Sequence, residues 1–173
     1  ATLEELVALG KKRLDSILAL GVTTVEGKSG YGLDHDTEIK QLQAMYMLNS
    51  THPVDIVSTF MGAHAIPGEF KDSPDAFIDY LIAHVLPDVV KSGLAEFCDV
   101  FCEEGVFTVE QSRRLLEAAR ALGLKVKIHA DEMASSGGSR LAVELMATSA
   151  DHLLHISDED IDRIARSNVV ATL

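Results

Sequence analysis

Histidines and carboxylates stand at the ends of several apolar runs in this sequence, and both residue types bind metal ions and transfer protons. In the run LKVKIHADE, apolar and polar residues alternate up to His129, as in a β-strand with one buried face, and Asp131 and Glu132 follow. Neutral imidazole is a common ligand of zinc and iron, and a carboxylate three residues beyond a ligand can face the same cavity and carry protons. The run indicates either a polar loop or the floor of a site for hydrolysis by metal-activated water.

Four other apolar runs also carry polar side chains near their ends. In chain order, these side chains are Glu26, Lys28 and Tyr31, then His64, then Glu103 and Glu104, and finally Asp151, His152 and His155. If the runs are parallel strands, five neighbouring strand ends deliver these groups to one rim, where barrel enzymes have their active sites. The sequence therefore predicts a single site built from several strands.

Each of these residues also has a simpler interpretation. Lys28 is equally consistent with a solvated loop charge, and Glu103 and Glu104 with ordinary loop acids. Tyr31 lies in SGYGLD, which is rich in turn-forming residues. His155 ranks below the other histidine of its run because it lies off that residue's face.

The elements that must position these residues alternate between strand and helix. We expect strands over residues 21–27, 54–64, 96–104, 124–130, 149–156 and 168–173. We expect helices over residues 2–18, 36–49, 73–90, 108–123, 139–148 and 157–167. Capping boxes at Thr2 and Thr108 begin two of the helices, and Pro87 should kink or divide the third. This alternation predicts an α/β fold with a parallel sheet.

Two architectures produce such a sheet. An open doubly wound sheet needs no more than six strands, whereas a (β/α)8 barrel needs eight strands and about 250 residues. Convergence of five strand ends on one rim favours the barrel. Because the 173 residues begin in a helix and stop on a strand, we expect a piece of a longer barrel protein.

Composition narrows the class of protein. The net charge of −12 disfavours nucleic acid and anionic membranes as partners, and no apolar run approaches the roughly 20 residues that span a bilayer. Cys98 and Cys102 lie four residues apart on one expected strand, so they share a face but are too far apart for a disulfide. We expect free, buried thiols in a reducing cytoplasm. No HxH or CxxC pair completes a zinc site.

Four segments closely resemble one family over essentially the whole chain. KSGYGLD, GAHAIP, CDVFCEEGVFTVEQSRRLLEAARALGLKVKIHADE and SADHL are similar to the imidazolonepropionases, which are metal-dependent amidohydrolases. The resemblance implies an incomplete TIM-like amidohydrolase barrel over residues 1–173, comprising about strands two to seven. The flanking barrel strands and a small β-sandwich would be absent. The implied reaction, in the full-length protein, is hydrolysis of the ring amide of 4-imidazolone-5-propanoate to N-formimino-L-glutamate in histidine degradation, with one zinc or iron ion per site.

The resemblance also implies a role for five residues. His129 would be a metal ligand, Glu132 a substrate contact and proton carrier, His152 the catalytic histidine, and Tyr31 and His64 substrate-binding residues. The family's HxH pair, last-strand aspartate and propanoate-binding arginine have no counterpart here, so we expect the chain alone to be inactive.

Two other functions stay open. They are another cyclic-amide hydrolase or ring deaminase of the same superfamily, and a catalytically silent α/β binding domain. The expected partner is a small-molecule substrate, and a homodimer is an open alternative.

Overall fold

Six parallel strands in sequential order form the framework of the molecule. The computed structural model describes residues 1–173, and in it the strands pair in the order β1-β2-β3-β4-β5-β6. The strands are β1 (Thr24–Lys28), β2 (Asp55–Ala63), β3 (Phe97–Cys102), β4 (Lys125–Ala130), β5 (Ser149–His152) and β6 (Val170–Thr172). Every neighbouring pair is parallel, which confirms the predicted parallel sheet.

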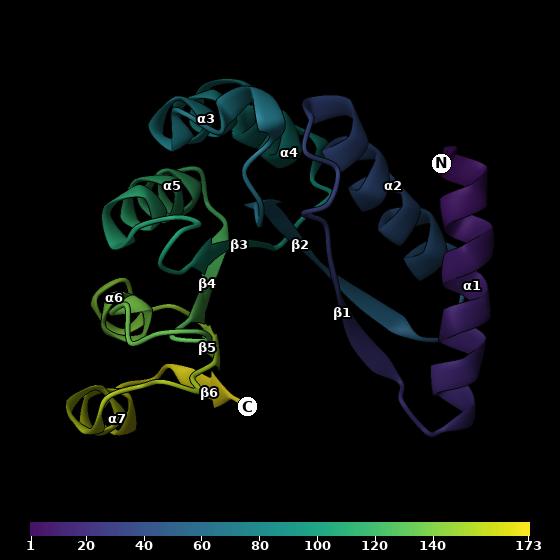
Figure 1. Cartoon of the computed structure of the whole chain (residues 1–173). Helices are drawn as coiled ribbons and strands as arrows, with labels where there is room; N and C mark the ends of the chain where they lie inside the picture. The colour runs from purple at the N-terminus through teal and green to yellow at the C-terminus, as the bar shows by residue number, and fades with distance from the viewer.

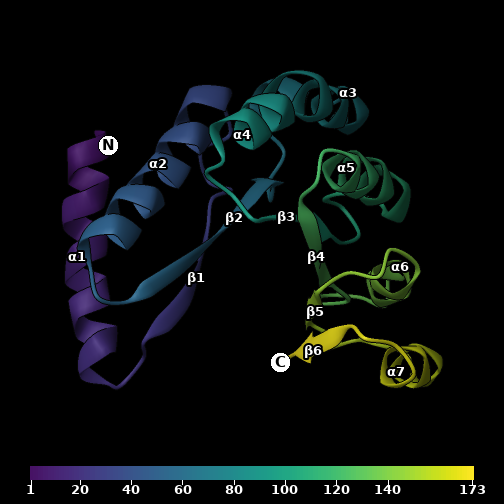
Figure 2. The same cartoon turned by 180° about the vertical axis from the view of Figure 1, so that it is seen from behind.

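The sheet is curled, and the helices lie on its convex side (Figures 1 and 2). These are α1 (Leu3–Ala19), α2 (His35–Thr51), α3 (Pro74–Tyr80), α4 (Leu86–Ser92), α5 (Val109–Ala121), α6 (Gly138–Glu144) and α7 (Asp158–Ala165). A doubly wound sheet reverses its strand order and carries helices on both faces. Sequential order with helices on one face makes the fold a half-barrel, so the doubly wound alternative is wrong.

Local sequence signals explain where several helices begin and break. The predicted capping boxes are present, from Thr2 to Glu5 in α1 and from Thr108 to Gln111 in α5. The helix expected over residues 73–90 is divided, with a π-helical turn (Leu81–Val85) between α3 and α4. Pro87 lies in the first turn of α4, where its missing N–H and its ring prevent an ordinary helical hydrogen bond. None of the helices has the length and apolar composition that crossing a bilayer requires.

The main core lies between the sheet and the helices. In β4, Val126, Ile128 and Ala130 are buried in this core, whereas Lys127 and His129 project from the opposite face. This alternation is the one predicted from the sequence. It leaves polar side chains on the concave face of the half-barrel.

Cys98 and Cys102 are buried in the same core and form no disulfide, as expected. Burial raises the pKa of both thiols, that of Cys102 to about 11. Both thiols are therefore protonated at neutral pH and serve as small apolar side chains.

One expected strand is shorter in the structure. The run at residues 149–156 is a strand only to His152, because His152 and Leu153 have φ angles of 78° and 56°. Left-handed backbone cannot continue a strand. His155 consequently lies in a turn after the strand, and its side chain is exposed.

Candidate active site

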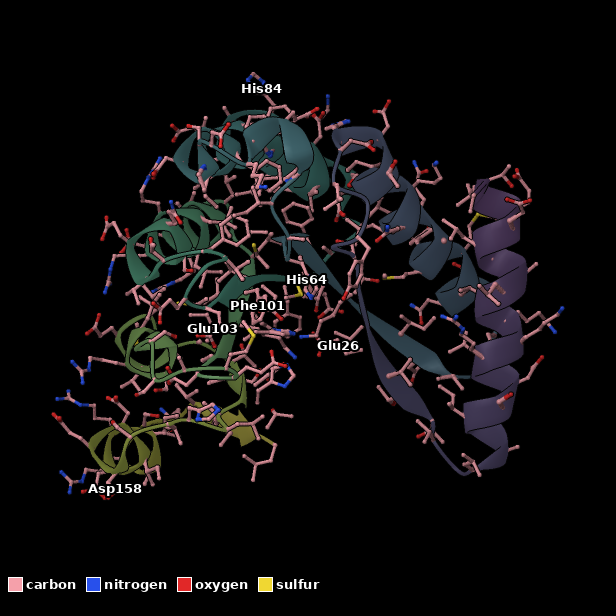
Figure 3. All side chains as sticks on the ribbon, in the orientation of Figure 1. Glu26, His64, His84, Phe101, Glu103 and Asp158 are labelled. Atoms are coloured by element: carbon pink, nitrogen blue, oxygen red, sulfur yellow. The ribbon has the colours of Figure 1, made fainter.

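The five residues that the sequence placed in one site lie together at the carboxyl ends of the strands. The ring centroids of Tyr31 and His64 are 4.5 Å apart, those of His64 and His129 6.3 Å, and those of His129 and His152 4.9 Å. The group ends at Glu132, whose Oε2 lies 3.6 Å from Nε2 of His152. The prediction that these five residues lie close together is thus confirmed. Figure 3 shows His64 on the concave side of the sheet, while His84 and Asp158 lie on the outer surface.

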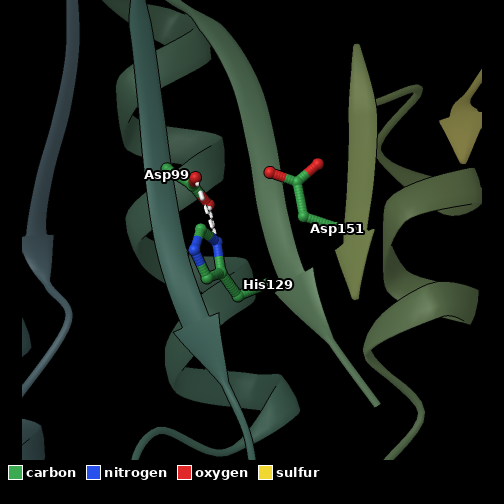
Figure 4. Close-up of side chains that lie close together, drawn as sticks. All are labelled: Asp99, His129 and Asp151. Atoms are coloured by element: carbon green, nitrogen blue, oxygen red, sulfur yellow. Dashed lines mark hydrogen bonds and ion pairs between the residues drawn. The ribbon is translucent and has the colours of Figure 1, made fainter. Parts of the chain in front are cut away.

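Asp99 determines how His129 presents its imidazole. Nδ1 of His129 lies 3.1 Å from Oδ2 of Asp99, whose side chain is completely buried (Figure 4). An ionised carboxylate only accepts hydrogen bonds, so in the neutral imidazole Nδ1 carries the proton and Nε2 keeps its lone pair. Nε2 of His129 makes no hydrogen bond in the structure. This is the arrangement in which a second residue orients a metal-binding histidine.

Lys28 is the counter-ion of two strand carboxylates. Its Nζ lies 2.6 Å from Oδ2 of Asp99 and 3.2 Å from Oδ2 of Asp151, and its side chain is 23% exposed. Burial alone would lower the pKa of Lys28, but Asp99 and Asp151 outweigh it and raise the pKa above its usual value. Lys28 is therefore firmly charged. Its interpretation as a solvated loop charge is wrong.

Burial alone would likewise raise the pKa of Asp99. The hydrogen bond with His129 and the charge of Lys28 outweigh burial and hold this pKa below its usual value. Asp99 is therefore ionised, which supports the assignment of the His129 proton to Nδ1. The sequence analysis missed Asp99, although it alternates with Cys98 and Val100 on β3 and so had to face the concave side.

The same network extends across the concave face. Glu26 of β1 accepts from Lys127 of β4 at 2.9 Å and lies 3.3 Å from Nζ of Lys28. Thr59 of β2 donates to the other oxygen of Glu26. Side chains from all of β1 to β5 thus belong to one polar network beneath the histidine cluster. Such a network fixes the strands against one another.

The residues fit a metal ion through one imidazole only. Asp99, His129 and Asp151 each offer one ligand atom, and these atoms lie within 4.8 Å of one another (Figure 4). An ion bound among all three would have to displace the ammonium group of Lys28 from both carboxylates. Nε2 of His129 is the nitrogen left with a free lone pair. His129 is therefore the ligand that these residues can offer without breaking the ion pairs of Lys28.

The loop that carries Tyr31 packs closely on His64. Gly30 has φ +124°, and a Cβ there would lie 2.8 Å from the backbone oxygen of Met61 and 3.0 Å from Cβ of His64. Buried Glu38 accepts hydrogen bonds from the N–H groups of Gly30 and, at 2.7 Å, of the glycine after Tyr31. The loop is therefore fixed on both sides of Tyr31.

A cleft of about 500 Å³ opens beside this loop, and its lining includes Tyr31, His64 and Phe101. The ring centroids of His64 and Phe101 are 5.7 Å apart. Burial lowers the pKa of His64, so its imidazole is neutral at pH 7. Nδ1 of His64 is buried without a hydrogen-bond partner. Apolar and aromatic side chains thus make up much of the cleft lining, as they do in small-molecule sites.

The two glutamates after β3 differ from each other. Glu104 is exposed, as expected of a loop acid. Glu103 is only 1% exposed and accepts hydrogen bonds from backbone N–H groups, two of them beyond β4. Its interpretation as an ordinary loop acid is wrong.

Curated relatives match the chain over all or nearly all of its length. It is 58% identical over 173 residues to an imidazolonepropionase of Alkaliphilus metalliredigens and to one of Clostridium tetani, and it covers 41% of each. It is 59% identical over 170 residues to that of Alkaliphilus oremlandii, covering 98% of this chain and 40% of the relative. The chain thus spans about two fifths of the length of these relatives.

Two further comparisons add little. No family model matches the chain. A dipeptide epimerase of Methylococcus capsulatus, solved with a magnesium ion, is 12% identical over 84% of this chain and 49% of its own, with a TM-score of 0.28, which is too low to support a conclusion. Over the two fifths of these relatives that it spans, the chain is similar throughout to the imidazolonepropionases.

Proposed function

We propose that this chain forms part of the active site of a metal-dependent hydrolase that opens the ring amide of 4-imidazolone-5-propanoate and yields N-formimino-L-glutamate. The observation that carries the proposal is the contact of His129, Glu132 and His152 on adjacent strand ends. The curated relatives named imidazolonepropionase support the choice of reaction. We assign β1 to β6 to barrel strands two to seven, and residues 1–173 to one partial barrel domain.

His129 is the residue proposed to hold the metal. Its Nδ1 is engaged by Asp99, so Nε2 is available as a ligand. When bound, a zinc or iron ion would polarise the ring carbonyl and lower the pKa of water to about 7. The remaining ligands would come from outside these 173 residues. The free buried thiols support a reducing, cytoplasmic location.

Glu132 and His152 are proposed to move protons. Hydrolysis of an amide removes a proton from the attacking water and adds one to the leaving nitrogen. Glu132 lies next to the metal-binding strand and is partly exposed, so its carboxylate is placed to accept the first proton and return it to the ring nitrogen. His152, 3.6 Å from Glu132, is placed to donate a hydrogen bond to the oxygen that becomes negative.

Tyr31 and His64 are proposed to bind the substrate. Their rings flank the cleft, where a planar five-membered ring can stack. Because the His64 imidazole is neutral, it places no charge against the uncharged ring of the substrate.

The test is a chimaera in which these 173 residues replace the matching segment of the Alkaliphilus metalliredigens imidazolonepropionase. We expect it to hydrolyse 4-imidazolone-5-propanoate with one metal ion per chain. His152→Ala should lower kcat by about 10²- to 10⁴-fold and keep the metal. His155→Ala is the matched control, since His155 is exposed outside the cluster and should leave kcat unchanged.

Two results would contradict the proposal. One is equal loss of activity in His152→Ala and His155→Ala, which would deny His152 a specific role. The other is release of ammonia from an aminated ring with no hydrolysis of the imidazolone, which would identify the ring deaminase alternative.

A further inference from the structure

Glu103 is a buried carboxylate that accepts hydrogen bonds from three backbone N–H groups. It follows β3, and its Oε2 accepts from the N–H of Glu132 and from that of Met133, both at 2.9 Å. Its Oε1 accepts from the N–H of Glu104 at 3.0 Å. Glu103 therefore links the end of β3 to the loop after β4, and it forms no hydrogen bond or ion pair with the side chains of the histidine cluster.

The loop after β4 needs such support. Asp131 has φ +51°, a conformation that a residue with a side chain adopts only under restraint. The buried carboxylate of Asp131 accepts from the N–H groups of Ser136, Gly137 and Ser139, which holds the far side of the loop. Glu103 holds the near side. Without Glu103, two N–H groups would lose their acceptor and the strained backbone could relax.

The residue held between these two carboxylates is Glu132. Its backbone N–H is bound by Glu103, and its side chain places Oε2 3.6 Å from Nε2 of His152. A displacement of about 1 Å at a reacting group can cost about 10²-fold in rate. The position of this one backbone segment therefore bears on the chemistry.

We propose that Glu103 is a positioning residue, which fixes the carboxylate of Glu132 against His152 by holding the N–H groups of Glu132 and Met133. The inference rests on the proposed function, in which Glu132 carries protons. It adds a requirement that the proposed function does not contain: the reach of the Glu103 side chain, rather than its charge, determines the rate.

Two substitutions separate reach from charge. Glu103→Asp keeps the carboxylate but shortens the side chain by one methylene, so it no longer reaches both N–H groups. Glu103→Gln keeps the length, and its amide oxygen can replace Oε2 as their acceptor, whereas its NH2 group replaces Oε1 and cannot accept from the N–H of Glu104. In the chimaera we expect Glu103→Asp to lower kcat by about 10- to 100-fold with little change in KM and full metal content. Glu103→Gln should lose clearly less activity than Glu103→Asp, because it gives up only the hydrogen bond with the N–H of Glu104. Glu104→Asp is the control for an exposed neighbour.

Two further measurements exclude a merely structural role. Glu103→Asp should cause no additional loss in a Glu132→Ala background, because it acts through the side chain that is already missing. Hydrogen exchange at the N–H groups of Glu132 and Met133 should become faster in Glu103→Asp and stay slow in Glu103→Gln.

Additive losses in the double variant would overturn the proposal. So would equal losses in Glu103→Gln and Glu103→Asp, unchanged exchange at both N–H groups, or loss of metal together with activity, since that would mean a collapse reaching His129. If the wild-type chimaera does not hydrolyse the imidazolone, the proposed function fails. The exchange measurement then still decides whether Glu103 holds this loop.

Discussion

Replacing Lys28 by methionine should destabilise the protein strongly. The substitution keeps much of the side-chain volume and removes the ammonium group, which lies 2.6 Å from Asp99 and 3.2 Å from Asp151. At an effective dielectric constant of about 20, the closer contact alone corresponds to about 6 kcal/mol of attraction, part of which offsets the cost of removing both charges from water. Removing one member of a buried ion pair typically costs about 3–5 kcal/mol. Because Asp99 is completely buried, water cannot take over the role of Lys28.

Urea denaturation of the 173-residue chain measures this loss as a change in the free energy of unfolding. A domain is stable by about 5–15 kcal/mol, so a loss of about 3–5 kcal/mol is easily detected. Lys11→Met is the control, since Lys11 is 62% exposed and 3.7 Å from its partner and should cost at most about 1 kcal/mol. Lys28→Met/Asp99→Asn should recover part of the loss, because the unpaired buried carboxylate is gone. A loss below about 1 kcal/mol in Lys28→Met, or no recovery in the double variant, would refute this account.

Three other outcomes are expected. His129→Ala should remove metal and activity together from the chimaera, as measured by metal analysis and turnover; an active, metal-loaded variant would contradict the ligand assignment. Gly30→Ala should lower the free energy of unfolding by about 1–3 kcal/mol, because the new Cβ would lie 2.8 Å from a backbone oxygen of β2, whereas Gly68→Ala has no neighbour within 4 Å and should be nearly neutral. Burial would raise the pKa of Asp160, but hydrogen bonds, including that with Arg140, outweigh it and lower this pKa. Its contribution is therefore complete above the unfolded pKa of about 4 and is lost as pH falls through the lower folded value. Asp160→Asn should thus be less stable than wild type at pH 7, with the difference closing in acid; a difference independent of pH would refute the charge argument.

The sequence predicted the cluster because two simple rules place its residues. Alternation along β4 puts His129 on the face opposite Val126 and Ile128, and parallel strands bring their carboxyl ends to one edge. The same rules, applied to FCDVFC, place Asp99 on the concave face between Cys98 and Val100. A signal for Asp99 was therefore present in the sequence. It was missed because the run is otherwise apolar.

The partners of Lys28 and Glu103 were not predictable in this way. Lys28 and Asp151 are separated by 123 positions in the sequence, and their contact depends on the curl of the whole sheet. Glu103 reaches N–H groups about 30 positions away. A local pattern shows which face a side chain occupies, but the atoms that it meets depend on the packing of distant strands.

Acidic residues at the rim of this half-barrel have two different tasks, and hydrogen bonding distinguishes them. Glu38, Glu103 and Asp131 are buried and accept from backbone N–H groups, so their carboxylates are committed to holding the loops. Glu132 is partly exposed and meets only an imidazole, which is why the proposed function assigns proton transfer to its carboxylate. A count of acids at strand ends therefore overestimates the number that do chemistry. The committed carboxylates nevertheless determine where the free one lies, and this is why substitutions that change only their length should alter the rate.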